Sequence, residues 1–132
     1  MALQLAISTR NARLDAIETD LGVSPILEIR TGAQPADCAA ADSGTVLATL
    51  NLPADFMAAA AAGAKAKSGT WQDAAADATG TAAHFRLKTS GGVCKLQGSC
   101  GMGSGDLQLD NTSLATGQPF TVTAFTLTDG NA

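Results

Sequence analysis

The residues most able to do chemistry in this chain are its cysteines and its single histidine, because together they could provide a nucleophile and a general base. The cysteines are Cys38, Cys94 and Cys100, and the histidine is His84. His84 lies in a stretch that alternates apolar and polar residues, which is typical of a strand histidine that faces solvent. A cysteine hydrolase would need Cys94 beside His84 across a hairpin. No GxSxG motif offers a serine instead, so we expect no catalytic residues and a protein that is not an enzyme.

The cysteine count is odd, which does not suit a secreted disulfide scaffold. Cys94 and Cys100 are six positions apart in the sequence. On one continuous strand they would lie roughly 20 Å apart, so a bond between them would need a turn near Gln97 and Gly98. Buried free thiols are the simpler interpretation. The sequence leaves the pairing of Cys94 with Cys100 open.

Metal and phosphate sites need spacings that this sequence does not have. Zinc requires three or four Cys or His ligands in paired spacing. The glycine-rich stretch GSCGMGSGD, residues 98–106, resembles a phosphate loop, but strand character follows it where a helix is needed. Asp106, Asp110, Asn111 and the terminal Asp129-Gly130-Asn131 could offer oxygen ligands to calcium, but they match no complete loop motif. We expect no metal and no cofactor.

Length and charge narrow the class of protein. The chain has 132 residues, enough for one domain, and its formal net charge is −4. Its eight basic residues are scattered, so a nucleic-acid partner is not expected. The longest apolar run, residues 57–62, is far shorter than the roughly 20 residues that span a bilayer. We expect no membrane partner and, because the first residues do not resemble a secretion signal, synthesis in the cytoplasm.

One helix is predicted, over residues 8–21. Ile7, Leu14, Ile17 and Leu21 recur at helical spacing, Ser8 or Thr9 can cap the start, and Gly22 can end the helix. The opposite face is polar and contains Arg10, Arg13, Asp15, Glu18 and Asp20. The apolar stripe either packs across an open edge of this chain's own sheet or docks on a neighbouring subunit. Its candidate protein-interface residues are Leu14, Ile17 and Leu21.

The rest of the chain has the pattern of short strands. Residues 81–89 place Thr81, Ala83, Phe85 and Leu87 on one face and Ala82, His84, Arg86 and Lys88 on the other, and Ser90-Gly91-Gly92 can reverse the chain into residues 93–100. Residues 34–44 contain an alanine-rich helical turn, whereas the alanine block 57–67 is expected to be extended. Further strands are predicted at residues 26–30, 45–52, 69–72, 106–111 and 119–128.

These elements predict a mostly β protein with one N-terminal α-helix. Short strands separated by glycine-rich turns favour an antiparallel β-sandwich or a jelly-roll-like barrel. The helical segment would occupy residues 1–22 and the β domain residues 23–132.

The order of several segments resembles small virion structural proteins of tailed bacteriophages. The matching segments are LDAIETDLG, ILEIRTGAQPA, SGTVLATLNL with the following Phe56, DATGTAAHFRL and the C-terminal DLQLDNTSLATGQPFTVTAFTLTDGNA. The resemblance covers nearly the whole chain, but Cys94, Cys100 and the block 57–67 have no counterpart in it. It carries over no catalytic residue.

The resemblance implies a capsid decoration or cement protein that stabilises contacts between capsid subunits. Such a protein would be a homo-oligomer on the virion, with the major capsid protein or other virion proteins as partners. A tail, collar or baseplate component is an alternative. A carbohydrate-binding β module of a host-recognition fibre is another, although only Trp71 and four phenylalanines could stack on a sugar.

Overall fold

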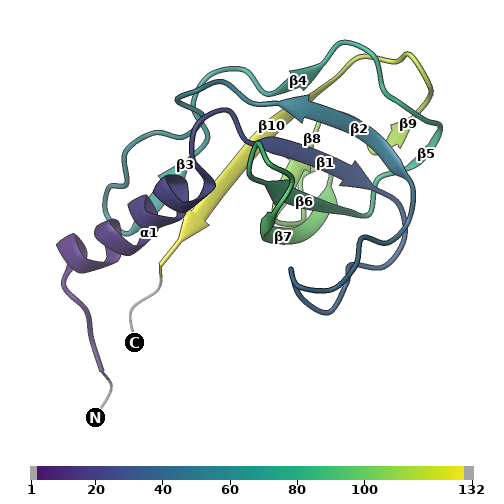
Figure 1. Cartoon of the computed structure of the whole chain (residues 1–132). Helices are drawn as coiled ribbons and strands as arrows, with labels where there is room; N and C mark the ends of the chain where they lie inside the picture. The colour runs from purple at the N-terminus through teal and green to yellow at the C-terminus, as the bar shows by residue number, and fades with distance from the viewer. Residues whose placement is uncertain (1–2, 130–132) are drawn as a thin grey trace.

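The structure, a computed structural model, describes residues 3–129 and is mostly β with one N-terminal helix. Figure 1 shows the helix lying beside one end of a strongly curled sheet. The elements are α1 (Ile7–Leu21), β1 (Ile26–Arg30), β2 (Val46–Asn51), β3 (Ala64–Ala66), β4 (Gln72–Asp73), β5 (Gly80–Thr81), β6 (His84–Lys88), β7 (Cys94–Gly101), β8 (Leu107–Leu109), β9 (Ser113–Leu114) and β10 (Phe120–Thr128). The predicted fold class is thus confirmed at the level of a mostly β chain with one leading helix.

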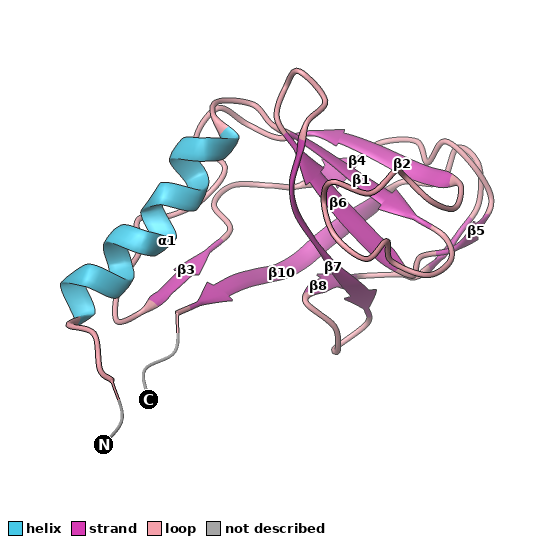
Figure 2. Ribbon diagram, turned by 60° about the horizontal axis from the view of Figure 1, so that its bottom comes forward, coloured by secondary structure: helices cyan, strands magenta, loops and turns pink. Residues whose placement is uncertain are grey.

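The main sheet is mixed and has the order β2-β1-β6-β7-β8-β10-β3, with β4 also paired to β10. Strands β5 and β9 form a separate two-stranded sheet. The pairing of β7 with β8 is parallel, through Cys100 with Leu107 and Gly101 with Gln108, and the other ladders are antiparallel. The prediction of a wholly antiparallel assembly is therefore wrong at β7 and β8. The curled sheet has the shape of a half-barrel (Figures 1 and 2).

Several local predictions are confirmed. The hairpin of β6 and β7 forms across residues 89–93, and β1 has the predicted bounds. The prediction that the alanine block is extended holds only in part, because the block turns at Ala62 and Gly63 and folds back on itself as a hairpin, with bridges from Met57 to Lys67 and from Ala61 to Ala64. Gly22 follows α1 with a positive φ of 78°, which favours glycine.

Three local predictions are wrong. Ala6, whose side chain cannot accept a hydrogen bond, is the residue before α1, and neither Ser8 nor Thr9 caps the helix. Residues 34–44 form turns and bends and contain no helical turn. The predicted strand 81–89 divides, because β5 pairs with β9 whereas β6 pairs with β1 and β7.

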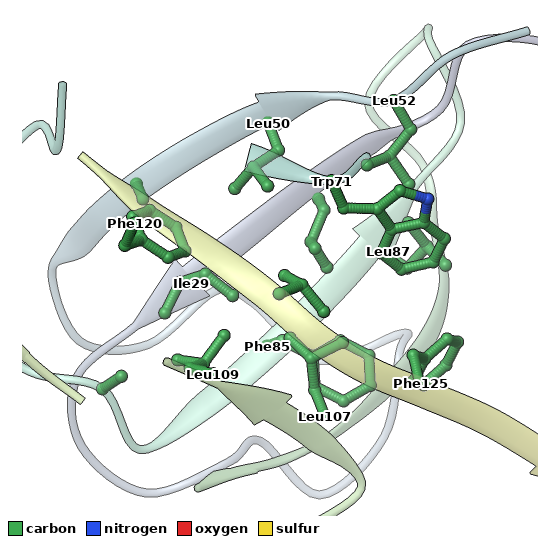
Figure 3. Close-up of a cluster of buried hydrophobic side chains, with 14 of the residues drawn as sticks. Ile29, Leu50, Leu52, Trp71, Phe85, Leu87, Leu107, Leu109, Phe120 and Phe125 are labelled. Carbon is green, nitrogen blue, oxygen red and sulfur yellow. The ribbon is translucent and has the colours of Figure 1, made fainter. Parts of the chain in front are cut away.

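The core lies inside the curl, where β10 and β8 cross over β1, β2 and β6 (Figure 3). Trp71 is the largest of its fully buried side chains. The Trp71 indole Nε1 donates to the carbonyl oxygens of Phe56 and Ser68, at 3.1 and 3.2 Å. The Trp71 ring lies 5.6 Å from that of Phe125, which also contacts Phe85 edge to face at 5.6 Å. Because the indole N–H is satisfied, this large ring can be buried without loss of a hydrogen bond.

Helix α1 docks on the sheet through both apolar and polar contacts. Leu14 and Leu21 are buried, as the alternative of packing on the chain's own sheet predicts. Residues on the polar face of the helix also contact the sheet. The Lys65 ammonium, on β3, is fully buried and lies 2.7 Å from both the Asp15 and Glu18 carboxylates.

The Lys65 ammonium has all three of its protons satisfied, because it also donates to the Ala58 carbonyl oxygen at 2.9 Å. Burial alone would lower the pKa of Lys65, but the hydrogen bonds to Asp15 and Glu18 outweigh it and the pKa is raised. The Lys65 contact likewise lowers the pKa of Asp15. Lys65 therefore stays charged and fixes the helix to β3.

We predict that Lys65→Met loosens α1. The substitution keeps much of the side-chain volume but leaves two carboxylates without a cation. Because these carboxylates are partly exposed, the loss in the free energy of unfolding should be about 1–2 kcal/mol rather than the larger cost of a fully buried unpaired charge. Urea denaturation measures the loss, and amide hydrogen exchange in residues 7–21 should accelerate. Lys67→Met, at an exposed hydrogen bond to the Gly69 carbonyl, is the control. Equal stability of the two variants would contradict the prediction.

Candidate functional site

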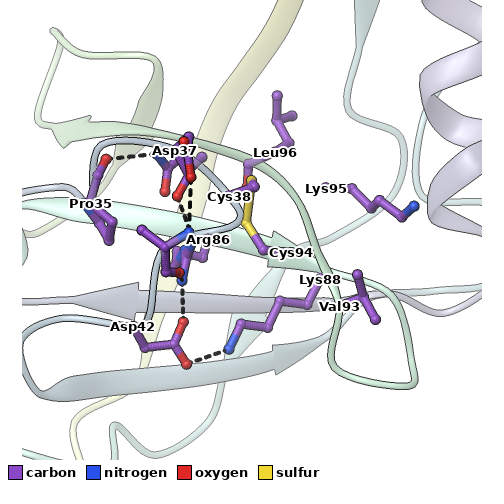
Figure 4. Close-up of a disulfide and its surroundings, with 12 residues drawn as sticks. Pro35, Asp37, Cys38, Asp42, Arg86, Lys88, Val93, Cys94, Lys95 and Leu96 are labelled. Atoms are coloured by element: carbon purple, nitrogen blue, oxygen red, sulfur yellow. Dashed lines mark hydrogen bonds and ion pairs between the residues drawn. A yellow bond between two sulfur atoms is a disulfide. The ribbon is translucent and has the colours of Figure 1, made fainter.

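Residues 31–45, which connect β1 to β2, fold back over the outer face of β6 and form a strap (Figure 4). Arg86, on β6, donates to the carbonyl oxygens of Asp37 and Ala40 in the strap. Gln97 Nε2 donates to the Pro35 carbonyl at 2.8 Å. The strap converts the outer face of β6 into a second buried surface.

The polar face of residues 81–89 was expected to meet solvent, and this expectation is wrong. His84, Arg86 and Lys88 are 1%, 2% and 8% exposed because the strap covers them. The His84 ring Nδ1 lies 2.9 Å from the Gly32 carbonyl oxygen. This bond requires a proton on Nδ1, so His84 helps to hold the strap.

Asp42 of the strap is the acidic residue that pairs with Arg30, Arg86 and Lys88. Its carboxylate lies 2.8 Å from Lys88 and 3.1 Å from Arg30, and it also contacts Arg86. Glu28 completes the cluster, with contacts of 2.8 Å to Arg30 and 2.9 Å to Lys88. The Lys88 hydrogen bond, together with Arg86 and Arg30, lowers the pKa of Asp42 to about 2.

The cysteines do not form the arrangement that a hydrolase would use. Cys94 forms a disulfide with Cys38 of the strap, with Cα atoms 5.3 Å apart, and is not bonded to Cys100. The expectation of free thiols is therefore wrong for Cys38 and Cys94 and correct for Cys100. Burial, with a smaller contribution from Asp106, raises the pKa of Cys100 to about 12. At neutral pH this thiol is protonated and is a poor nucleophile.

The other chemical candidates have structural roles. The glycine-rich stretch ends β7 and leads into β8, with no helix after it. The Asp106 carboxylate accepts from the Ser99 amide at 3.0 Å, and Asp110 and Asn111 accept from the amides of Thr121 and Ser113. Asp129 pairs with Arg13 at 3.2 Å, whereas Gly130 and Asn131 lie outside the described residues. Within residues 3–129, no group of three or more His, Cys, Asp or Glu residues is placed to hold a metal ion.

The structure also bears on sugar binding and on membrane insertion. All aromatic side chains of the chain are 3% exposed or less, so none offers a ring for sugar stacking. Of the described residues, no helix is long and apolar enough to cross a bilayer.

A groove with an apolar lining lies between β7 and the C-terminal part of β10. It has a volume of about 390 Å³. The apolar residues that line it are Phe85, Leu96, Phe125 and Leu127. Leu96 and Leu127 are only partly buried, although both pack against the core.

The groove continues toward α1. A second hollow, of about 430 Å³, shares Thr128 with the first and is lined by Leu14 and Ile17 of the helix. Of the predicted interface residues, Leu14 and Leu21 are 3% and 2% exposed and pack within the chain, whereas Ile17 is partly exposed. A role for Leu14, Ile17 and Leu21 in contacts between chains stays a prediction, and Ile17 is the member whose surface a partner can reach.

Sequence patterns could identify Ile17 but neither the strap nor the groove. Leu96 and Leu127 occupy ordinary apolar positions in two strands 31 residues apart, and only the sheet topology places them together. The only sequence feature that pointed to the strap was Cys38, whose role the pattern of residues 34–44 did not explain.

We predict that Asp42 makes the stability of the protein dependent on pH in acid. Because its folded-state pKa of about 2 lies below the ordinary 3.8, its contribution is complete above about pH 4 and is lost as the pH falls toward 2. After allowance for partial exposure the loss should be about 1–2 kcal/mol. Urea denaturation at pH 7 and at pH 2 should show a smaller change for Asp42→Asn than for wild type. The exposed control Asp55→Asn should follow wild type, and identical behaviour of all three would contradict the assignment.

We predict one disulfide and one protected thiol. Peptide mapping without reduction should recover Cys38 joined to Cys94, and iodoacetamide should label Cys100 only after unfolding. The bond encloses a sequence separation of 56 residues, so its removal in a Cys38→Ser, Cys94→Ser variant should lower the free energy of unfolding by about 2–4 kcal/mol. Recovery of a Cys94–Cys100 peptide, or rapid labelling of the folded chain, would contradict this arrangement.

Comparison of the chain with protein-family models, with curated proteins and with solved structures gave no match. No family assignment follows from these comparisons. The groove beside α1, β7 and β10 is therefore put forward on its geometry alone.

Proposed function

We propose that the chain is a structural protein of a tailed-bacteriophage particle, and that it acts as a capsid decoration or cement protein. In this role it binds the major capsid protein or other virion proteins and stabilises the contacts between capsid subunits. The groove with the partly exposed Ile17, Leu96 and Leu127 is the observation that carries the proposal. Apolar surface of this kind gains free energy when a partner removes it from water.

The Cys38–Cys94 disulfide supports a place on a particle. Disulfides are rare in proteins that stay in a reducing cytoplasm, whereas they persist on virion surfaces. A chain made in the host cytoplasm would then form this bond when the particle meets an oxidising medium. The disulfide joins the strap to β7, the strand that also carries Leu96 of the groove.

The open sheet supports a homo-oligomeric or mixed assembly. A half-barrel has strand edges and apolar surface that a neighbouring subunit can cover. The sequence predicts a jelly-roll-like barrel. We propose that this barrel forms on assembly, when a neighbouring subunit closes the open side of the half-barrel. A tail, collar or baseplate position would use the same surface and remains the alternative location on the particle.

We predict that Ile17→Asp weakens binding to the particle. The chain, added to particles of its own virus that lack it, should co-sediment with them and raise the temperature at which they release DNA. Ile17→Asp puts a charge at the groove and should lower the affinity at least tenfold, with a melting temperature of the free chain close to that of wild type. Ala12→Asp, on an exposed part of α1, is the matched control.

Failure of the wild-type chain to bind, together with its absence from purified particles, would contradict the proposed function. Equal binding by Ile17→Asp and wild type would remove Ile17 from the interface but leave the particle location in place.

A further inference from the structure

The C-terminal part of β10 has one strand edge without a partner. The Lys67 amide donates to the Phe125 carbonyl and the Asp129 amide donates to the Gly63 carbonyl, both at 2.9 Å. Phe125 and Asp129 therefore direct their backbone groups toward β3. Because these directions alternate along a strand, the N–H and C=O groups of Thr126 and Thr128 point the other way.

Strand β8 covers that other side only as far as Phe125. Its ladder with β10 runs from Val122 paired with Leu109 to Phe125 paired with Leu107. Beyond Leu107 the chain turns away into residues 102–106. The register that pairs Phe125 with Leu107 directs the Thr126 amide toward the Asp106 carbonyl. Among the described residues, the Thr126 carbonyl and both backbone groups of Thr128 have no partner strand on this side, and both threonines are exposed.

Strand β7 presents a second free edge across the groove. The Cys100 amide donates to the Ala83 carbonyl at 3.1 Å, so Cys100 faces β6 and, by the same alternation, Gln97 and Ser99 face away from it. The Ser99 amide is bonded to Asp106. The backbone groups of Gln97 have no partner strand among the described residues.

The groove lies between these two edges, in line with β8. It is lined by the partly exposed Leu96 and Leu127 and extends from Asp106 to Thr128. A β-carbon at Gly98 would come within 2.7 Å of Asp106 Oδ2 and 2.8 Å of the Phe85 ring, so the glycine allows both side chains to approach β7. At about 3.4 Å per residue, the stretch from Thr126 to Thr128 lies opposite about three residues of an added strand.

The charge at one end of the groove also restricts the occupant. The Asp106 carboxylate accepts hydrogen bonds from Ser99, and within residues 3–129 no cation pairs with it. A basic side chain would complement it. Unpaired backbone groups on both walls complement a peptide backbone, because only an extended chain supplies donors and acceptors at the spacing of a strand.

We propose that this groove binds an extended segment of a partner protein, which pairs with Thr128 and the Thr126 carbonyl of β10, places apolar side chains on Leu96 and Leu127, and carries a basic residue that reaches Asp106. The bound segment continues the line of β8 and joins β7 to β10. This inference rests on the proposed function for the identity of the partner, whereas the chemistry of the site can be tested without a particle.

Amide hydrogen exchange measured by NMR tests the pairing directly. The probe is a capped six-residue peptide that alternates valine with threonine and ends in lysine. In the free chain the amide of Thr128 should exchange quickly and those of Leu127 and Asp129 slowly. With saturating peptide, exchange at Thr128 should slow at least tenfold. The same peptide with a central proline, which lacks an amide donor, should have a weaker effect.

A pair of variants provides a second readout. Thr128→Pro removes only the amide that faces the groove, since the pairing with β3 uses Phe125, Leu127 and Asp129, whereas Thr128→Val keeps it. The peptide affinity should fall at least tenfold in Thr128→Pro and stay within twofold in Thr128→Val, with both variants folded by circular dichroism.

Three results would overturn the inference: unchanged exchange at Thr128, equal binding by Thr128→Pro, or protection that appears without peptide and increases with chain concentration. The last would mean that a second copy fills the groove. Because no particle is used, each result is separate from the failure of the proposed function.

Discussion

The short parallel pairing of β7 with β8 determines the shape of this molecule. Only Cys100 and Gly101 of β7 pair with β8, and β8 in turn pairs with β10. This one strand therefore carries the sheet from the β6–β7 hairpin to β10 and allows it to curl around Trp71. Because β8 is only three residues long, β7 and β10 separate beyond it. Strand β8 thus accounts both for the curl that encloses the core and for the groove that begins where β8 ends.

Buried charges fix the two segments that would otherwise be loose. Lys65 holds α1 against β3, and Asp42 holds the strap against Arg30, Arg86 and Lys88. Ion pairs of this kind add little net stability when compared with apolar packing, but they penalise any arrangement that leaves one charge unpaired. In this chain they specify where the helix and the strap lie, and the disulfide at Cys38 adds a covalent constraint.

Local pattern was enough to predict the elements whose structure depends on neighbouring residues. The alternation in β1, β6 and β10, the glycines between β6 and β7, and the helical spacing of Leu14, Ile17 and Leu21 are all of this kind. Features that join distant segments could not be predicted. The parallel pairing of β7 with β8, the burial of His84 and Arg86 under the strap, and the bond from Cys38 to Cys94 depend on contacts between residues far apart in the sequence. The same reason explains why the groove was missed, although Ile17 at its end was identified.

The proposed adhesion to partner proteins would need a rigid frame and a surface that a partner can complete, and the described residues are consistent with both. Electron cryo-microscopy of particles that contain the chain tests this most directly. We expect an extended segment of a neighbouring protein in the groove between β7 and β10, within hydrogen-bonding distance of Thr128. An attached chain whose groove is empty and open to solvent, with its contacts on another face, would contradict this account.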